Sequence, residues 1–352
     1  MRSFSSRLIG WQKRHGRHGL PWQGADAYRV WLSEIMLQQT QVVTVIPYYQ
    51  RFVAAFPDPA VLARATEEEV LAHWSGLGYY ARGRNLHRAA RIVAEQYGGA
   101  FPRHFEQIVE LPGVGRSTAA AICSLAYHER RAILDGNVRR VLARHSGIEG
   151  WTGEKKVETQ LWQRAEQLLP PASSPKSDFA IYTQALMDLG ATVCTRSKPK
   201  CEACPVGGDC DAARTGRVAE LPTPRRNRPV PERQAAFLLL LHGSDILLEK
   251  RPPTGIWGGL WCPPQFDDEA AALAWCAQRN LEPASGPVEQ SGEGWQPFSH
   301  TFTHFKLNIT PVPLRLAHKP RQVERAGSTW LNVQEALQGA IPAPVRRMLQ
   351  RA

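Results

Sequence analysis

Apolar side chains recur at the spacing of an amphipathic helix through the first two thirds of the chain. One such stripe covers residues 28–35 and follows Asp26, a residue type that often begins a helix. Similar stripes, separated by glycine or proline, cover residues 61–71, 86–92, 119–125, 157–168 and 179–189. The pattern predicts that this part of the chain folds mostly as α-helices.

The pattern changes after residue 233. Runs of leucine, β-branched and aromatic residues at 237–241, 245–248 and 305–309 predict strands. The alanine-rich segment 269–278 lies between them and predicts a helix. The last part of the chain is therefore expected to be α/β or α+β.

A segment rich in proline and arginine separates the two patterns. Residues 221–233 hold four prolines, which lock φ and remove backbone donors, so the segment predicts an extended linker. We expect a helical domain at 1–220 and an α/β domain at 234–352.

Basic residues outnumber acidic ones by 43 to 32 among the 352 residues, a formal charge of +11. Residues 1–233 carry 32 basic and 22 acidic side chains, whereas residues 234–352 carry 11 and 10. The excess lies before the α/β domain and points to a polyanion as the partner of the helical domain. Hydrophobic residues make up 43% of the chain, which excludes wholesale disorder.

The first 20 residues mix basic and apolar side chains and contain no continuous apolar segment of the kind that a secretory signal has. The longest apolar run, at 235–241, is far shorter than the roughly 20 residues of a membrane span. We expect a soluble, cytoplasmic protein with no membrane partner.

Four of the seven cysteines lie within seventeen residues, with the spacing Cys-x6-Cys-x2-Cys-x5-Cys. In a chain without an export signal, clustered thiols are more typical of metal ligands than of disulfides. Structural zinc and free cysteines remain alternatives, but zinc sites usually pair two short hooks and this loop has one. The donor set favours one 4Fe–4S cluster, whose ligands would be Cys194, Cys201, Cys204 and Cys210.

Two further segments offer contacts to phosphate. LPGVGRST at 111–118 precedes a helical run, and Gly113 and Gly115 permit a tight turn that exposes the first amides of that helix. Residues 108–125 thus have the helix-hairpin-helix pattern, which contacts the DNA backbone, although a generic glycine turn is the alternative. The loop between the first two cysteines carries three basic residues that either hold phosphate or are simply solvated. They are Arg196, Lys198 and Lys200.

Together these motifs resemble the endonuclease III superfamily of DNA glycosylases, and within it the MutY-type adenine DNA glycosylases. The resemblance covers nearly the whole chain and includes LPWQ at 20–23, WLSEIMLQQTQV at 31–42, GLGYYAR at 76–82 and LDGNVRRV at 134–141. It implies hydrolysis of the N-glycosidic bond of adenine mispaired with 8-oxoguanine or guanine, in base excision repair. The implied partner is double-stranded DNA with such a mispair, bound by a monomeric, nucleoid-associated enzyme of bacterial type.

Cleaving a nucleoside bond needs a proton for the leaving base and negative charge near the oxocarbenium-like sugar, so two carboxylates are expected. Glu34 lies in the apolar segment WLSEIML, where partial burial would raise its pKa, although an isolated helix glutamate is more often exposed. Asp135 opens DGNVRRV, which by itself is more often a turn or a helix cap. The resemblance implies that Glu34 protonates adenine at N7 and that Asp135, with Asn137 nearby, stabilises the sugar cation.

The resemblance also implies contacts to DNA. After LPGVGR, endonuclease III has the lysine that forms a Schiff base with the sugar, whereas this chain has Ser117, so a monofunctional hydrolase is predicted. Extruding adenine requires a wedge and a pocket, and the aromatic candidates for both are equally compatible with a place in the core. The implied wedge residues beside 8-oxoguanine are Gln39 and Tyr79, with Leu77 in the same loop as Tyr79. The implied adenine pocket contains Trp22 and Gln23.

Residues 251–266 resemble part of the Nudix-fold (MutT-like) C-terminal domain of the same family. Hydrolases of that fold carry a REXXEE helix that binds magnesium, and the helix here, DDEAAALAWCAQRN, lacks that spacing. A recognition domain without hydrolase activity is therefore expected. Two triplets are candidates for the family's Phe-Ser-His motif, which reads 8-oxoguanine, and the flanking sequence favours the second over residues 298–300. That second triplet is Phe302, Thr303 and His304.

Two rival functions stay open at this point. One is a bifunctional pyrimidine glycosylase and lyase of endonuclease III type, against which Ser117 counts. The other is a non-catalytic iron-sulfur protein that binds DNA. Product analysis separates all three functions.

Overall fold

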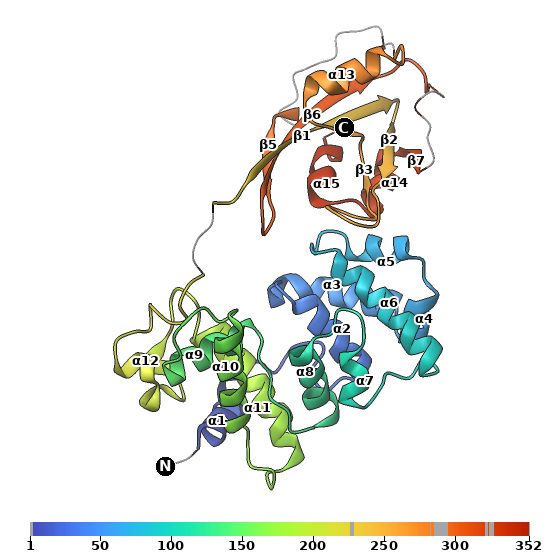
Figure 1. Ribbon diagram of the computed structural model, residues 1–352. Helices are drawn as coiled ribbons and strands as arrows, with labels where there is room; N and C mark the ends of the chain where they lie inside the picture. The colour runs from blue at the N-terminus through green and yellow to red at the C-terminus, as the bar shows by residue number, and fades with distance from the viewer. Residues whose placement is uncertain are drawn as a thin grey trace. The chain divides into compact units, whose positions relative to one another are not determined.

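The computed structural model describes residues 3–225, 229–281, 283–284, 295–320, 323 and 327–351 (Figure 1). The chain forms two compact units. The first joins residues 1–64 to residues 85–227, and the second joins residues 65–84 to residues 228–352. Residues 226–228 of the predicted linker lie outside the described residues.

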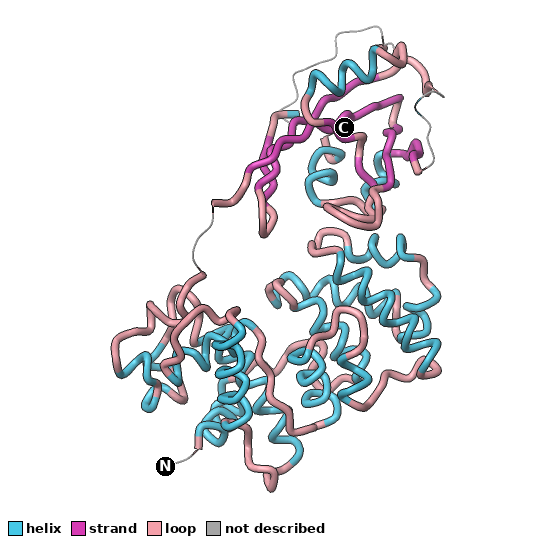
Figure 2. The backbone as a smooth tube through the Cα atoms, in the orientation of Figure 1, coloured by secondary structure: helices cyan, strands magenta, loops and turns pink. Residues whose placement is uncertain are grey.

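The first unit is helical, and the strands of the sheet belong to the second (Figure 2). No helix in the described part of the chain is both long and apolar enough to cross a membrane. The helices of the first unit are α1 (Phe4–His15), α2 (Ala27–Leu37), α3 (Val42–Ala55), α4 (Pro59–Arg64), most of α6 (Ala81–Gln96), α7 (Phe105–Val109), α8 (Arg116–Tyr127), α9 (Gly136–Ser146), α10 (Lys155–Gln167), α11 (Lys176–Asp188) and α12 (Asp211–Arg214).

The helices predicted from the apolar stripes are present, with one correction. The stripe at 61–71 is divided between α4, which ends at Arg64, and α5 (Glu67–Trp74). Thr66 Oγ1 accepts a hydrogen bond from the Glu69 amide at 3.2 Å, and Glu69 Oε2 accepts one from the Thr66 amide at 2.7 Å. This capping box begins a new helix at Glu67. The same break separates the two compact units.

The core of the helical unit fixes the helix ends that surround the site. Leu8 of α1, Ala121 of α8, Val138 of α9, Leu161 of α10 and Leu186 of α11 belong to one buried cluster. Burying a leucine side chain contributes about 2 kcal/mol, so this cluster holds the start of α8, the start of α9 and the end of α11 in fixed relation.

The second unit is built on a mixed sheet with the strand order β3-β2-β1-β6-β5. The central strand β1 pairs parallel with β6 and antiparallel with β2 and β4, while β7 pairs with β2. The strands are β1 (Glu232–His242), β2 (Asp245–Lys250), β3 (Trp261–Cys262), β4 (Gln265–Phe266), β5 (Phe298–Thr301), β6 (Lys306–Arg315) and β7 (Ser328–Asn332). The helices after the linker are α13 (Glu269–Ala277), α14 (Val333–Gln338) and α15 (Ala343–Leu349).

The three predicted strands lie on β1, β2 and β6, and the predicted helix is α13. Strand β1 begins at Glu232, two residues inside the segment predicted as linker. Leu238 and Leu240 pack against Ala272 of α13 in one buried cluster, and Leu239 and Leu241 are buried as well. Coverage of both faces explains why the strand is a continuous apolar run instead of an alternating one.

Residues 65–84 pack against the sheet. Glu68 of α5 accepts hydrogen bonds from Lys250 Nζ at 2.8 Å and from Trp261 Nε1 at 2.6 Å. Ser75 Oγ donates to the carbonyl of Ile341 at 2.7 Å. The loop between α5 and α6 therefore belongs to the same unit as the β5–β6 hairpin.

Candidate functional site

A pocket of about 980 Å³ opens in the helical unit, where the end of α2, the starts of α8 and α9 and the end of α11 meet. We call it the carboxylate pocket, because both predicted catalytic carboxylates line it. Six of the predicted site residues are part of its wall: Trp22, Glu34, Gln39, Ser117, Asp135 and Asn137. The fold thus gathers in one place side chains that are far apart in the chain.

Glu34 is partly buried between apolar neighbours on α2. Burial raises the pKa of Glu34 to about 8, and the negative charge of Asp135 raises it as well. A carboxyl group with this pKa keeps its proton at neutral pH and is a competent general acid.

Asp135 is the N-cap of α9 and is also partly buried. Its Oδ1 accepts a hydrogen bond from the Val138 amide at 2.7 Å. Burial raises the pKa of Asp135, while the amides of Val138 and Asn137 and the charges of two arginines act in the opposite direction. Hydrogen bonds to the charged form favour it, so the ionised form of Asp135 is better supported than that of Glu34.

Ser117 fixes the segment that leads into Asp135. The Leu134 amide donates to Ser117 Oγ at 2.9 Å, and Leu134 precedes Asp135 directly. Ser117 therefore holds the backbone beside one of the two carboxylates.

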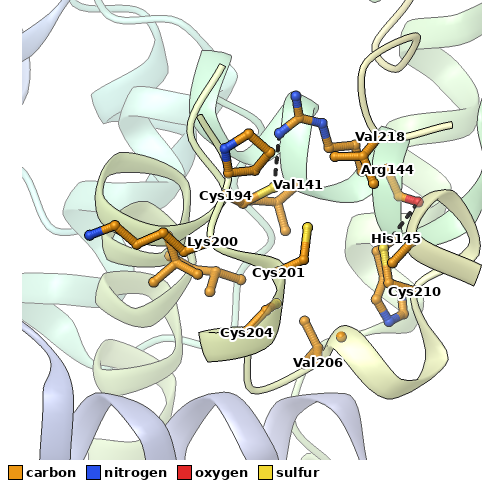
Figure 3. Close-up of a pocket in the computed structure, with 15 residues that line it drawn as sticks. Val141, Arg144, His145, Cys194, Lys200, Cys201, Cys204, Val206, Cys210 and Val218 are labelled. Atoms are coloured by element: carbon orange, nitrogen blue, oxygen red, sulfur yellow. Dashed lines mark hydrogen bonds between the residues drawn. The ribbon is translucent and has the colours of Figure 1, made fainter. Parts of the chain in front are cut away.

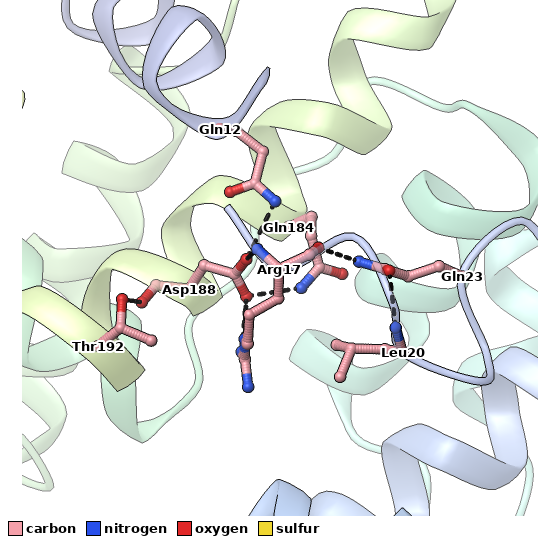
Figure 4. Close-up of polar contacts among 7 residues, drawn as sticks. All are labelled: Gln12, Arg17, Leu20, Gln23, Gln184, Asp188 and Thr192. Carbon is pink, nitrogen blue, oxygen red and sulfur yellow. Dashed lines mark hydrogen bonds and ion pairs between the residues drawn. The ribbon is translucent and has the colours of Figure 1, made fainter. Parts of the chain in front are cut away.

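An ion pair between Arg17 and the buried Asp188 supports another wall of the pocket (Figure 4). Asp188 is fully buried at the end of α11 and accepts hydrogen bonds from Gln12 Nε2 at 3.0 Å and Gln184 Nε2 at 2.8 Å. The Arg17 guanidinium donates to Asp188 Oδ1 at 2.6 Å, and the Arg17 amide donates to Oδ2 at 2.8 Å. A buried carboxylate is stable only when its oxygens are paired in this way. Arg17 and Gln184 also line the carboxylate pocket.

Gln23 fixes the backbone of this wall through two hydrogen bonds. Its Nε2 donates to the Arg17 carbonyl at 2.6 Å, and its Oε1 accepts from the Leu20 amide at 3.0 Å (Figure 4). It is not among the residues that line the pocket, in contrast to Trp22. Sequence reasoning missed Arg17 and Gln184, because the Arg17–Asp188 pair spans 171 positions and leaves no local pattern.

The glycine turn before α8 has the form that the sequence predicts. Gly113 has a φ of +81°, and a Cβ there would lie 2.9 Å from the Asn85 side chain, so glycine is required. Gly115 is the N-cap of α8 and offers no side chain to its first amides. Nothing lies within 4 Å of a Cβ built on Gly115, so the space beside this cap is open. The first amides of a helix are groups that bind anions.

The four clustered cysteines line one pocket (Figure 3). The four side chains lie around this pocket. Among the described residues, no group of three or more His, Cys, Asp or Glu is placed to bind a single metal ion. Arg144 is buried and donates to Cys194 Sγ at 3.4 Å. Burial and, to a smaller extent, the neighbouring thiols raise the pKa of Cys204 to about 11. Four thiolates in this setting require compensating positive charge, which fits a polynuclear metal cluster.

The basic loop faces solvent. Arg196, Lys198 and Lys200 are exposed, and the Lys200 amine points away from the cysteines (Figure 3). The loop backbone is fixed, because the Arg144 guanidinium donates to the carbonyls of Thr195 at 2.7 Å and Arg196 at 3.0 Å.

A second candidate site lies in the sheet unit, at the turn between β5 and β6. The Phe302 amide donates to the Phe305 carbonyl at 2.8 Å, which closes the turn and leaves Thr303 and His304 exposed. Tyr79 Oη lies 3.4 Å from Thr303 Oγ1. We call this turn, residues 302–305, the hairpin tip.

Tyr79 is 48% exposed, whereas Leu77 in the same loop is buried. The alternative triplet lies within β5, where Ser299 Oγ hydrogen-bonds to Asn308 Oδ1 at 2.7 Å. Of the two triplets, residues 302–304, which the sequence favours, are therefore the ones that lie beside Tyr79. Gln39 is also exposed and has a φ of +58°, in the turn between α2 and α3.

Two family models match the chain, and the first also covers residues 65–84, which pack with the sheet. Residues 32–167 match the model of the HhH-GPD superfamily of base excision DNA repair proteins, and residues 235–351 match a NUDIX domain. The chain is 36% identical to the adenine DNA glycosylase of Buchnera aphidicola (subsp. Acyrthosiphon pisum), over 99% of this chain and 97% of that one. The chain belongs to the adenine DNA glycosylase family. The human adenine DNA glycosylase is 34% identical, over 99% of this chain and 73% of its own.

Solved structures support the fold of the helical part of this family member. A thermostable thymine-DNA glycosylase is 29% identical with a TM-score of 0.54, covering 60% of this chain and 95% of that one. An endonuclease III in non-covalent complex with DNA has a TM-score of 0.50 at 19% identity, covering 60% of this chain and 94% of its own, and shows the fold alone.

Residues 194–210 match the iron-sulfur binding domain of endonuclease III. With the four cysteines at one pocket, this family member carries a 4Fe–4S cluster held by that loop. This match favours the iron-sulfur cluster over the structural zinc site that the cysteine spacing left as an alternative.

Proposed function

We propose that this protein is a monofunctional DNA glycosylase that hydrolyses the N-glycosidic bond of adenine mispaired with 8-oxoguanine or guanine. The observation that carries the proposal is the carboxylate pocket, where Glu34, with a pKa near 8, and the capped Asp135 share one wall with Ser117. The enzyme acts as a cytoplasmic, nucleoid-associated monomer on double-stranded DNA.

Glu34 supplies the proton that makes adenine a leaving group. Its carboxyl group carries a proton at neutral pH, because burial and Asp135 raise its pKa to about 8. The proton moves to N7 of the extruded adenine while the bond from C1′ to N9 breaks and its electron pair leaves with the base. The resulting Glu34 carboxylate then accepts a proton from water as that water adds to C1′.

Asp135 stabilises the positive charge that develops on the sugar. Its ionised form is supported by the Val138 amide at 2.7 Å, and Asn137 lines the same pocket. Electrostatic stabilisation of this kind is strong in a partly buried site, because solvent screening is weak there.

Water is the final acceptor, because the pocket offers no amine to form an imine. Ser117 occupies the position of the Schiff-base lysine, and none of the described residues that line the pocket is lysine. The Ser117 hydroxyl is instead engaged with the Leu134 amide. Lyase chemistry is therefore not part of the proposal.

The DNA backbone is held by the amides at the start of α8 and by the basic loop of Arg196, Lys198 and Lys200. Cys194 and Cys201 flank this loop, and with Cys204 and Cys210 they would hold the 4Fe–4S cluster, whose bonds to the thiolates would fix both ends of the loop. Gln39 and Tyr79 act as wedges, and Phe302, Thr303 and His304 read the 8-oxoguanine.

The test is product analysis under single-turnover conditions on duplexes with adenine opposite 8-oxoguanine, guanine or thymine, and on a duplex with thymine glycol. The proposal expects alkali-labile sites at adenine opposite 8-oxoguanine and guanine, and no adduct trapped by borohydride. Intact adenine in both mispairs, or efficient trapping with thymine glycol, would overturn it. Full duplex binding without any alkali-labile product would instead identify a non-catalytic DNA-binding protein.

A further inference from the structure

The loop between α5 and α6 holds a tyrosine in an unfavourable backbone conformation. Gly76, Gly78 and Tyr79 have φ values of +98°, +77° and +49°. Glycine adopts such angles without cost, but for a side chain like tyrosine the left-handed region costs on the order of 1 kcal/mol or more. The surrounding structure must hold Tyr79 in place, since the backbone alone does not favour this conformation.

Arg82 is placed to do this. It is the second residue of α6 and is 8% exposed, so its guanidinium needs hydrogen-bond partners within the protein. Its guanidinium donates to the carbonyls of Leu77 at 3.4 Å and Gly78 at 3.2 Å. These are the carbonyls on either side of the second glycine, so the guanidinium ties down the part of the loop that turns the chain toward Tyr79.

Two aromatic rings flank the same guanidinium. Its central carbon lies 5.4 Å from the centre of the Trp74 ring and 5.4 Å from that of the Tyr79 ring. Trp74 Nε1 also donates to the Gly78 carbonyl at 3.1 Å. The planar cation thus joins the end of α5, the loop backbone and the Tyr79 ring, and a lysine ammonium lacks the fork and flat face for all of these contacts.

The result is a tyrosine whose ring is held by Arg82 and whose hydroxyl lies 3.4 Å from Thr303 at the hairpin tip. The hairpin tip is braced in turn by Trp257, whose ring centre lies 5.5 Å from that of Phe302. The wedge and the lesion-reading turn are therefore presented together.

We propose that Arg82 is a positioning residue for lesion preference: it holds Tyr79 at the hairpin tip and so favours adenine opposite 8-oxoguanine over adenine opposite guanine. This inference rests on the proposed function, in which Tyr79 is the wedge beside 8-oxoguanine. Arg82 does not touch the reacting atoms, so it acts through Tyr79.

The experiment compares Arg82→Lys and Tyr79→Ala, alone and combined, with Arg88→Lys as the matched control. Arg88 lies on the same helix, is exposed and contacts Asn85 at 2.8 Å. Single-turnover rates and Kd are measured on the 8-oxoguanine and guanine mispairs, with thermal unfolding of each variant. Arg82→Lys should lower the preference for 8-oxoguanine by about tenfold, with little change in the rate on the guanine mispair.

The double variant decides how Arg82 acts. If Arg82 works through Tyr79, adding Arg82→Lys to Tyr79→Ala changes the preference no further, because the two residues share one effect. Additive losses, or an Arg82→Lys enzyme with the same preference as Arg88→Lys, would overturn the inference. A wild-type enzyme without any preference would instead count against the proposed function.

Discussion

The carboxylate pocket and the hairpin tip differ in the kinds of residue that form them. The pocket is lined by ionisable groups whose pKa values burial has raised, and a backbone amide and a serine fix the positions around them. The hairpin tip has an aromatic stack and an exposed threonine, and Tyr79, whose backbone is strained, lies beside it. Bond cleavage needs charge in a partly dry site, whereas reading a base needs shape and a few hydrogen bonds. Changes in the first region should affect rate, and changes in the second should affect preference.

Glu34→Gln gives the sharpest test of the first region and the largest expected effect. Glutamine keeps the shape but has no proton to give, so the single-turnover rate on either mispair should fall by about 10² to 10⁴. DNA affinity should change little. Glu95→Gln, an exposed change on α6, is the control. A Glu34→Gln enzyme with the full rate would remove Glu34 from the mechanism.

The pH profile is expected to show the next largest effect. Since the pKa of Glu34 is raised to about 8, the rate should fall by about tenfold for each pH unit well above 8. Because the pKa of Glu34 is higher in the folded protein, Glu34 also makes the free energy of unfolding depend on pH. Its contribution to stability is present at low pH and is lost as the pH rises through about 8. Glu34→Gln should therefore raise Tm more at pH 9 than at pH 5. A flat rate between pH 7 and 10 would contradict the assignment.

Thr303→Ala tests the second region. The exposed hydroxyl beside Tyr79 is removed, so the preference for 8-oxoguanine should fall by about tenfold, the worth of one good hydrogen bond. The rate on the guanine mispair should stay within about twofold. Ser299→Ala removes the hydroxyl of the other triplet and should leave the preference unchanged. The reverse outcome would transfer lesion reading to residues 298–300.

Ser117→Ala has the smallest expected effect and tests whether the first region needs a fixed backbone. The Leu134 amide loses its hydrogen-bond acceptor, which costs about 1 kcal/mol. The single-turnover rate should therefore fall by about three- to tenfold on both mispairs. The ratio between the two mispairs should not change. An altered ratio with an unaltered rate would break the division between the two regions.

Sequence and structure agree best where the information is local. Apolar spacing locates α2, α8 and β1, and the two glycines locate the start of α8, because these features depend on neighbours within a few residues. The break before α5 was also local: Thr66 and Glu69 form a capping box whose spacing is visible in the chain. The role of Asp135 as a cap could be expected from Asp-Gly-Asn.

Long-range pairings could not be predicted in the same way. Arg17 and Asp188 meet across 171 positions, and Glu68 meets Lys250 across 182. Neither pair has a periodic pattern around it, since one arginine or glutamate on a helix is ordinarily solvated. The second wall of the carboxylate pocket and the attachment of α5 to the sheet therefore emerge only from the fold.

The attachment of residues 65–84 to the sheet changes how the chain can be recombined. A chimera that exchanges only residues 234–352 with those of a relative would pair a foreign sheet with the native Glu68, Ser75 and Tyr79, all of which contact residues of that segment. A chimera that keeps these contacts has to exchange residues 65–84 together with residues 234–352. The unit that can be transferred is therefore discontinuous in the gene although it is continuous in space.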